Sequence, residues 1–311
     1  MLPLIIINPT SARGATGVAW PAMASALSTH FGPFNCEFTK EPGDAVRRAN
    51  VGAKEGRRLI IACGGDGTIS EVANGILESG KDVELGILPS GTGGDFQRNL
   101  KIPTRVADAA RLLREGSTRR IDAGWITYIN YDGIEESRYF LGVASFGMSG
   151  EVISRVKNND SKRLGGRAAF GLAMLQTTLT KQNSNVLVQL DDQPERHLTL
   201  ANLCVANGRY FGGGMKIAPE AKLDDGLFDI VTIGDLGAVK ILSNAYQLYL
   251  GTHLGMKQVH HVLTRRVTAR PVTKNEPVAI EVDGELPGYL PATFSIRPRA
   301  LRVRMPSSNA L

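Results

Sequence analysis

Aspartate and threonine side chains stand among glycines in the stretch "CGGDGTISEVANGI", which runs from Cys63 to Ile76. The apolar residues before it predict a strand and the residues after it predict a helix, so the glycines form the turn between them. The backbone N–H groups of such a turn and the N-terminus of the helix both attract phosphate. The stretch indicates either a phosphate site or a plain sharp turn in which Thr68 and Glu71 cap the helix.

Two further glycine-rich turns follow other predicted strands. "SGTGGDFQRNL" begins at Ser90, and "NPTSARGATG" begins at Asn8 after the first apolar run. The carboxyl ends of parallel strands meet at one edge of a sheet, where open α/β sheets bind ligands. Three turns at one edge favour a cradle for the phosphates of a nucleotide. The residues assigned to this cradle are Asn8, Gly64, Gly65, Asp66, Gly67, Thr68, Gly91 and Thr92.

Carboxylates lie inside this expected cradle. Asp66 would repel a phosphate unless a cation lay between them, which favours Mg²⁺, an ion that binds one or two carboxylates plus phosphate oxygens. Asp95 and Asp122 are expected at the ends of two further strands. They could complete a metal and water network, or they could cap turns. Asp66 and Asp95 are therefore assigned catalytic roles, and Asp122 is assigned to the metal.

The elements that position these residues follow from hydrophobic patterning. Short apolar strands alternate with helical stretches up to about residue 122, which predicts a parallel sheet with helices on both faces. After Trp125 a two-residue alternation dominates, and Asp132-Gly133 indicates a hairpin. The expected strands are 4–8, 36–39, 58–62, 85–89 and 119–123, and the expected helices are near 18–30, 43–55, 68–79, 104–115, 151–181 and 235–250.

This change of pattern predicts two domains. Residues 1–124 form a nucleotide-binding α/β domain, and residues 125–299 form a mainly antiparallel, β-sandwich-like domain. Residues from about 300 to 311 are expected to pack back onto the first domain.

Composition places the chain among ordinary globular proteins. Of its 311 residues, 42% are hydrophobic and 21% are charged, and the net charge of +6 is compatible with anionic partners. No nucleic-acid-binding motif accompanies this charge, so we expect no nucleic acid partner. Cys36, Cys63 and Cys204 stand in apolar surroundings and predict buried thiols in a reducing, cytoplasmic setting. No apolar run is long enough to span a bilayer.

Several longer stretches resemble the diacylglycerol kinase catalytic family, in particular the bacterial soluble lipid kinases. "NPTSARG", "GGDGTISEVANGI" and "LGILPSGTGGDF" match that family in the first half, and "DDGLFD" and "VDGE" match it in the second. G-G-D-G-T also occurs in NAD kinases and phosphofructokinases, so the later stretches are what favour a lipid kinase. The chain departs from the family at Ala12, where Gly is usual, and at Gly94, where Asn is usual.

The resemblance implies an ATP- and Mg²⁺-dependent kinase that phosphorylates a hydroxyl group of a lipid such as diacylglycerol, with residues 125–299 as the lipid-binding domain. Arg13 and Arg98 match positively charged positions near the phosphates, and Thr39 matches a nucleotide contact. Glu285 in "VDGE" resembles the family's proton acceptor and is assigned a catalytic role. By spacing alone, the Asp-Gly pair before it favours a hairpin turn.

The resemblance also implies a structural magnesium site in "KLDDGLFD". Its ligands would be the carbonyl oxygens of Lys222 and Leu227 and the side chain of Asp225, with Asp224 as the alternative. Oxygen-rich turns of this kind suit a hard cation.

Residues 151–182 carry six Lys or Arg against two acidic residues, followed by an apolar run. This pattern predicts transient contact with an anionic membrane surface, or else a helix that packs in the core beside a solvated basic segment. A kinase for a sphingoid base, another lipid alcohol or NAD stays open as an alternative. So does an inactive relative that only binds nucleotide or lipid.

Overall fold

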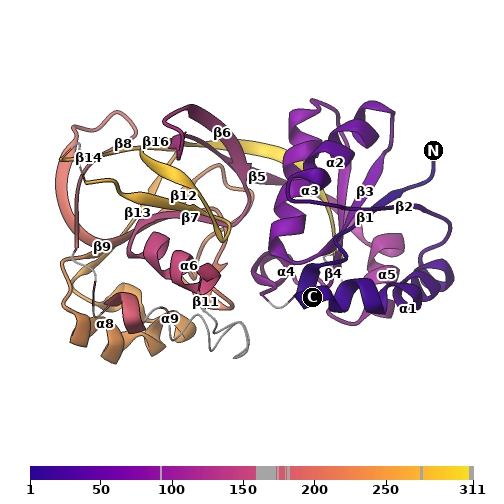
Figure 1. Cartoon of the computed structure of the whole chain (residues 1–311), viewed down its shortest axis with the longest axis horizontal. Coiled ribbons are helices and arrows are strands. Elements are labelled where there is room, and N and C mark those ends of the chain that lie inside the picture. The colour runs from indigo at the N-terminus through magenta and orange to yellow at the C-terminus, as the bar shows by residue number, and fades with distance from the viewer. Residues whose placement is uncertain are drawn as a thin grey trace. The chain divides into compact units, whose positions relative to one another are not determined.

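The computed structural model describes residues 1–91, 93–158, 173, 175–178, 180, 183–273 and 276–307. The chain divides into two compact units, Met1–Asp122 with Arg299–Leu311, and Ala123–Pro298. Strands β5 (Ser117–Asn130) and β16 (Glu285–Met305) each have residues in both units, so they carry the chain from one unit to the other (Figure 1).

A parallel sheet forms the centre of the first unit, in the order β4-β3-β1-β2. Val303 of β16 pairs in parallel with Leu85, on the far side of β4. The inner strands are buried along their whole length, as expected for a parallel sheet that is covered on both faces. The strands are β1 (Leu4–Ile7), β2 (Asn35–Phe38), β3 (Leu59–Gly64) and β4 (Glu84–Pro89).

Helices cover both faces of this sheet (Figure 1). Helices α1 (Ala15–His30) and α5 (Val106–Glu115) pack their apolar side chains against Ile5 and Ile61. Side chains alternate along a strand, so Leu4 and Ile60 point to the opposite face. There they meet α2 (Asp44–Lys54), whose neighbour is α3 (Asp66–Glu78). The predicted α/β fold class of this half is confirmed.

Two local expectations are wrong. Helix α3 begins at Asp66 with Gly65 as its N-cap, so Thr68 is not the capping residue. Glu71 accepts the backbone N–H of Ala45 at 3.3 Å, which ties α3 to α2. Cys36 is exposed, because β2 is the edge strand of the sheet, whereas Cys63 and Cys204 are buried free thiols.

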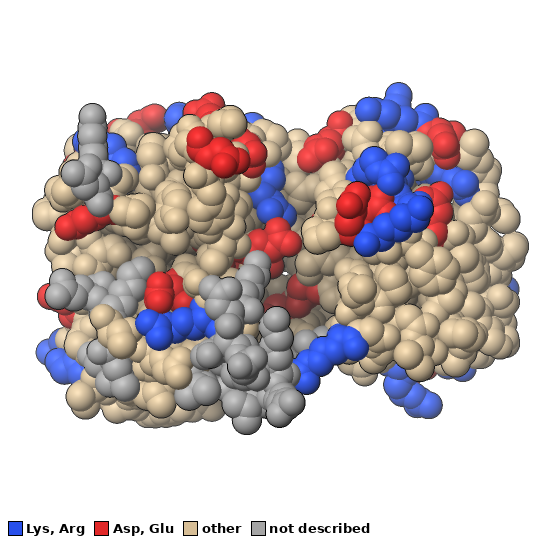
Figure 2. Space-filling view, viewed as in Figure 1, with Lys and Arg blue, Asp and Glu red and all other residues tan. Residues whose placement is uncertain are grey.

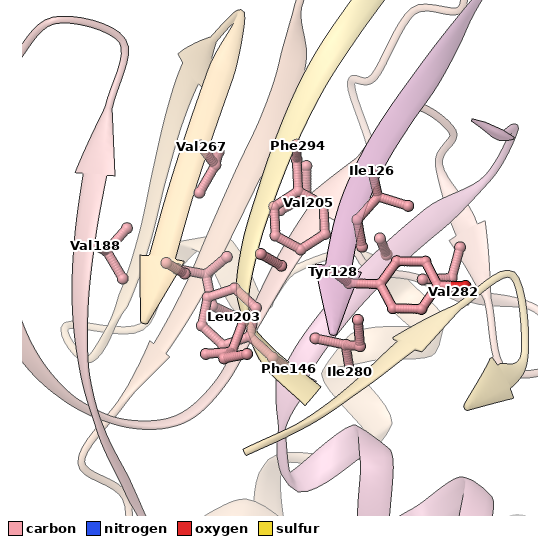
Figure 3. Packing of buried hydrophobic residues seen from close by; sticks show 14 of the residues in the cluster. Ile126, Tyr128, Phe146, Val188, Leu203, Val205, Val267, Ile280, Val282 and Phe294 are labelled. Carbon is pink, nitrogen blue, oxygen red and sulfur yellow. The ribbon is translucent and has the colours of Figure 1, made fainter. Parts of the chain in front are cut away.

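Antiparallel strands make up most of the second unit, as the sequence predicts. The β5–β6 hairpin turns at Asp132-Gly133, where the alternation places it. Phe140, Phe146, Phe228 and Phe294 are fully buried at its centre. Figure 3 shows Phe146 and Phe294 among the aliphatic side chains of this core. The strands are β6 (Glu135–Phe140), β7 (Val143–Gly147), β8 (Ser184–Leu190), β9 (Arg196–Ala206), β12 (Phe228–Gly234), β13 (Val259–Thr264), β14 (Arg266–Pro271) and β15 (Ala279–Val282), with the small hairpin of β10 (Tyr210–Phe211) and β11 (Met215–Lys216).

Short helices complete both units. The helix expected near 235–250 is broken into two pieces, and α6 contains the start of the helix expected near 151–181. Within the described residues, no helix is long and apolar enough to cross a bilayer. The short helices are η1 (Ser11–Gly14), α4 (Asp95–Leu100), α6 (Met148–Asn158), α8 (Ala238–Asn244), α9 (Tyr246–Leu250) and η3 (His253–Gly255).

Candidate functional site

Three loops meet at the carboxyl edge of the parallel sheet in the first unit. The Asn8 side chain, after β1, donates from Nδ2 to Thr68 Oγ1 at 3.1 Å, in the first turn of α3. Ser11 Oγ lies 3.4 Å from the same Thr68 oxygen. The N–H of Ser90, after β4, donates to the carbonyl of Gly64 at 2.9 Å. The glycine-rich turns that lie far apart in sequence are therefore neighbours in the fold.

Gly91 is required by a close approach of two loops. A Cβ on Gly91 would lie 2.5 Å from the Cα of Gly65, a distance at which one backbone would have to move. Any side chain at this position would therefore force the loop after β3 away from the loop after β4.

Gly67 has a different explanation. Its φ is not positive, and apart from its chain neighbours and the backbone of its own helix, no described atom lies within 4 Å of the place where a Cβ would be. The fold would tolerate alanine here, and alanine is a better helix former than glycine. Because glycine has no side chain, the space beside the backbone of the first turn of α3 is open. An anion could approach the N–H groups there.

Asp66 joins the first glycine loop to the second. Its Oδ2 accepts the N–H of Asp95 at 3.1 Å and its Oδ1 accepts the N–H of Phe96 at 3.0 Å. These are among the N–H groups at the start of α4 that have no partner inside the helix, so Asp66 caps α4 from a distant part of the chain. Two carboxylate oxygens offer about four acceptor positions, so Asp66 keeps the capacity to bind a cation as well.

Arg98 holds the second loop from the other end of α4. Its Nη1 donates to the carbonyl of Gly93 at 2.6 Å and to Asp95 Oδ1 at 2.8 Å. The guanidinium is only partly buried. It therefore places a planar cation with several donors at the loop, which suits a phosphate.

Ala12 and Gly94, the two residues that depart from the family pattern, both have left-handed backbone conformations. Gly94 has φ +68°, a conformation that Asn also adopts readily, so glycine here keeps the backbone that the usual Asn would have. Ala12 has φ +51°, and Arg13 beside it has φ +60°. Ala12 stands where the family has glycine and therefore carries backbone strain.

Asp122 does not lie at a strand end, as the sequence suggested, but inside β5, which continues to Asn130. It is fully buried, and its Oδ1 accepts the N–H of Arg299 at 2.6 Å. Arg299 has φ +52°, so this carboxylate supports an irregular residue of β16. Throughout the described part of the chain, no three His, Cys, Asp or Glu side chains form a ready metal site. A metal at Asp66 and Asp95 would need further ligands, such as phosphate oxygens.

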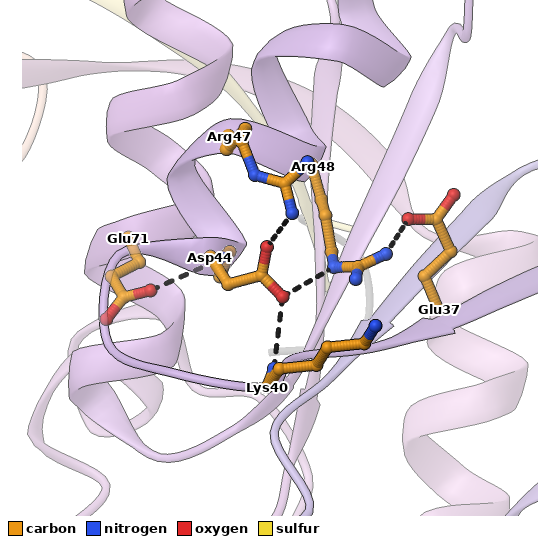
Figure 4. A network of polar contacts seen from close by, with 7 residues as sticks. Glu37, Lys40, Asp44, Arg47, Arg48 and Glu71 are labelled. Atoms are coloured by element: carbon orange, nitrogen blue, oxygen red, sulfur yellow. Dashed lines mark hydrogen bonds and ion pairs between the residues drawn. The ribbon is translucent and has the colours of Figure 1, made fainter.

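A polar network holds the segment that contains Thr39 (Figure 4). The N–H of Thr39 donates to the carbonyl of Ile7 at 2.8 Å, beyond the end of β2. Buried Asp44 accepts the N–H of Lys40 at 3.0 Å and the Nε of Arg48 at 2.9 Å. Burial alone would raise the pKa of Asp44, but these donors outweigh it and lower the pKa. Asp44 therefore stays charged and fixes the loop between β2 and α2.

Asp44 was missed as a functional candidate by sequence reasoning. The signal was available, because an Asp four residues before an Arg on a helix is a common stabilising pair. Arg47 also bonds to Asp44, and Arg48 also bonds to Glu37. The bond to Glu37 joins α2 to β2, so it depends on the tertiary fold.

Glu285 follows a two-residue turn in the second unit. Asp283 and Gly284 have φ of +48° and +86°, which is the backbone of a tight β15–β16 hairpin. Oδ2 of Asp283 accepts the N–H of Leu141 at 2.9 Å, and Oδ1 accepts the N–H of Gly142 at 2.9 Å. The hairpin expected from spacing is present, and it fixes the backbone on which Glu285 stands.

Arg138 pairs with Glu285, a contact that sequence reasoning missed. Its Nη1 donates to Glu285 Oε2 at 2.8 Å. Burial acts to lower the pKa of Arg138, but the negative charge and hydrogen bond of Glu285 raise it above the ordinary value. The guanidinium therefore remains charged and orients the Glu285 carboxylate. No local pattern marks this pair, since its members are 147 residues apart.

The candidate magnesium turn lies just before β12. Asp225 Oδ1 accepts the N–H of Leu227 at 3.1 Å, and Lys222, Asp224 and Asp225 are exposed. Strand β12 carries buried Asp229, whose pKa is raised by burial; the hydrogen bond and charge of His261 act to lower it, and the charges of Asp225 and Glu220 add to the rise. Like charges near one another disfavour ionisation, and a bound cation would relieve this.

Two sequence-based candidates lie outside the described residues. Thr92, assigned to the phosphate cradle, is one of them, and most of the basic segment assigned to the membrane, residues 159–172, is the other.

Each half of the chain matches a known protein family. Residues 3–126 match the diacylglycerol kinase catalytic domain, and residues 142–305 match the YegS C-terminal NAD kinase beta sandwich-like domain. The resemblance seen in the sequence and the predicted β-sandwich-like second half are confirmed.

Individual proteins show the same similarity along nearly the whole chain. A diacylglycerol kinase of Bacillus subtilis (strain 168) is 29% identical over 310 residues, which cover 98% of this chain and 97% of the relative. A diacylglycerol kinase of Staphylococcus saprophyticus is 30% identical over 93% of this chain and 90% of the relative. A solved structure of a Bacillus anthracis protein assigned to the diacylglycerol kinases has a TM-score of 0.78 at 26% identity, covering 98% of this chain and 95% of that one. The chain therefore belongs to the diacylglycerol kinase family, whose members are phosphotransferases that act on an alcohol group.

Proposed function

We propose that this protein transfers the γ-phosphate of ATP, with Mg²⁺, to a hydroxyl group of diacylglycerol in the cytoplasm, in transient contact with a membrane. The observation that carries the proposal is the junction of three loops at the sheet edge, next to the first turn of α3, where Gly67 leaves open space. Family membership supplies the reaction class, because a kinase needs a nucleotide to supply the phosphoryl group.

The nucleotide is assigned to the first unit. Backbone N–H groups at the start of α3 and the loops at Gly65 and Gly91 would hold the phosphates, with Arg13 and Arg98 adding positive charge. Thr39 would contact the nucleotide from the loop that Asp44 fixes. Asn8 and Thr68 would keep the loops after β1 and β3 together.

Magnesium would be held by Asp66 and Asp95 together with phosphate oxygens, a donor set that fits the preference of this ion. Asp122, already bonded to the Arg299 backbone, would act behind them through water. An ion held there would supply positive charge that neutralises the phosphates.

The acceptor hydroxyl is assigned to Glu285. Its carboxylate can take the proton of the hydroxyl as the oxygen attacks phosphorus. Arg138 would orient the carboxylate for this role, and the Asp283-Gly284 turn would fix its backbone.

To test the function, the purified protein is incubated with Mg²⁺, ATP labelled at the γ-phosphate and one candidate acceptor at a time. Lipid acceptors are supplied in mixed micelles. The panel contains diacylglycerol, a sphingoid base, a monoacylglycerol and NAD. We expect label in phosphatidic acid. Label in another product would identify one of the alternative substrates, and no labelled product would indicate an inactive relative.

Gly67→Ala is expected to separate the fold from nucleotide binding. Alanine should stabilise the first turn of α3 by up to about 1 kcal/mol, because it is the better helix former. Its methyl group would fill the space assigned to phosphate, so the Kd for Mg²⁺-ATP should rise at least about tenfold, which corresponds to roughly 1.4 kcal/mol. Thermal unfolding and calorimetric titration measure the two effects.

Gly255→Ala is the matched control, since Gly255 also has open space at its Cβ position among the described residues but lies outside the candidate site. It should leave the ATP affinity unchanged. If Gly67→Ala binds Mg²⁺-ATP as tightly as the wild type, the phosphates are not at the start of α3.

Asp225→Ala is expected to abolish stabilisation by Mg²⁺ at the turn before β12. An ion that binds only the folded protein stabilises it by about 2.7 kcal/mol at one hundred times its Kd. The measurement is the rise in melting temperature on adding Mg²⁺ without nucleotide. Asp192→Ala, another exposed turn aspartate, serves as the control and should keep the full rise. Equal rises in wild type and Asp225→Ala would exclude this site.

A further inference from the structure

Helices α8 and α9 of the second unit expose large apolar side chains. Val239 is 80% exposed, Tyr246 and Leu250 are each 61% exposed, and Tyr249 is 44% exposed. We call these four side chains the apolar ridge. In Figure 2 the coloured part of the surface at the lower left, where Figure 1 shows α8 and α9, is mainly tan, with blue side chains at its left edge.

The ridge is not a by-product of core packing. Leu248 of α9 is 7% exposed and belongs to a buried cluster that includes Ile217. Tyr246, Tyr249 and Leu250 have the spacing i, i+3, i+4, so they share the other side of the helix. A surface helix of a globular protein normally places polar residues on that side. Helix α9 is apolar on both sides, which indicates that its outer side meets a partner.

Three lysines and two acidic residues, Glu220 and Asp235, lie on or close to the segments that carry the ridge. Lys240 follows Val239 directly, and Lys257 is exposed beyond α9. A Cβ on Gly251, at the end of α9, would lie 3.3 Å from the Cδ of Lys216. Asp235 is the only acidic residue from 235 to 257. Apolar and tyrosine side chains flanked by lysines are typical of surfaces that lie in the headgroup region of a bilayer.

We propose that the apolar ridge docks on the surface of an anionic phospholipid bilayer. This inference rests on the proposed function, because a substrate with acyl chains resides in a membrane. Contact with the bilayer surface would bring the enzyme to such a substrate. Val239, Tyr246, Tyr249 and Leu250 would enter the interface, and Lys216, Lys240 and Lys257 would meet the lipid phosphates.

The test compares three forms of the full chain in sedimentation with vesicles of equal parts phosphatidylcholine and phosphatidylglycerol. The variant Val239→Ser/Tyr246→Ser/Leu250→Ser removes most of the ridge. The control Val18→Ser/Val51→Ser/Ile134→Ser removes three exposed apolar side chains elsewhere. We expect the ridge variant to bind vesicles at least tenfold more weakly and the control to bind like the wild type. Unfolding temperature checks that each variant is folded.

Activity on short-chain dioctanoylglycerol in detergent separates this proposal from the proposed function. The ridge variant should phosphorylate it as fast as the wild type, because no membrane is needed. Absence of product from the wild type would contradict the proposed function, whereas the vesicle comparison decides the docking proposal by itself. Equal vesicle binding by wild type and ridge variant, or no binding by the wild type, would overturn it. So would a wild-type dimer that the ridge variant loses while vesicle binding stays unchanged.

Discussion

Asp66→Asn is expected to lower kcat at least about 100-fold, the loss typical when a preorganised charge at the reacting groups is removed. Asparagine keeps the size of the side chain but loses the negative charge assigned to Mg²⁺. Its amide group can also accept only one of the two N–H bonds that the carboxylate now accepts from Asp95 and Phe96. The measurement is kcat at saturating ATP, Mg²⁺ and lipid.

Asp108→Asn is the control for this substitution, since Asp108 makes exposed ion pairs with Arg105 and Arg111 and has no assigned role in the site. It should leave kcat unchanged, because exposed pairs contribute little. The free energy of unfolding of Asp66→Asn should fall by no more than the loss of a helix cap explains, about 1 kcal/mol. A folded Asp66→Asn protein with near wild-type turnover would contradict the assignment of Asp66.

Glu285→Gln is expected to lower kcat by about 10²–10⁴-fold, because glutamine cannot take the proton of the acceptor hydroxyl. The affinity for Mg²⁺-ATP should stay the same, since the nucleotide is assigned to other residues. Steady-state kinetics with varied diacylglycerol, together with a nucleotide titration, measure both quantities.

Glu136→Gln provides a matched control close to Arg138 in sequence. Glu136 accepts hydrogen bonds from Tyr128 and Asn130 and has no assigned role in proton transfer, so its variant should turn over normally. If Glu285→Gln turns over normally as well, the base lies elsewhere and Asp66 becomes the candidate. Glu285 would then be only the first residue after a hairpin turn.

The fold class could be predicted from the sequence because patterning marks its elements directly. The apolar run of β3 followed by glycines and a helix is a local signal, and so is the alternation around Asp132-Gly133. Helix α4 was missed because its six residues are too few to show a helical period. Asp122 was misplaced because β5 continues past it to pair with β6 from Gly124 onwards, and pairing of this kind depends on the tertiary fold.

The sequence also predicts part of the candidate site, namely which residues belong to it, but not what each of them contacts. Glycine and aspartate in the loops are visible as motifs, so Gly67 and Asp66 could be chosen from the sequence. Their physical roles could not, because the open space at Gly67 and the capping of α4 by Asp66 depend on where distant segments lie. The pairing of Arg138 with Glu285 was hidden for the same reason.

The central claim is that the three loops at the sheet edge bind the phosphates of ATP, and amide hydrogen exchange tests it most directly. Exchange is followed in the wild-type protein with and without Mg²⁺-ATP, and in Gly67→Ala as a control. We expect slower exchange on ATP addition in residues 8–14, 64–68 and 91–98 of the wild type, and little change there in Gly67→Ala. Unchanged exchange in all three loops of the wild type at saturating Mg²⁺-ATP, or protection confined to other segments, would contradict it.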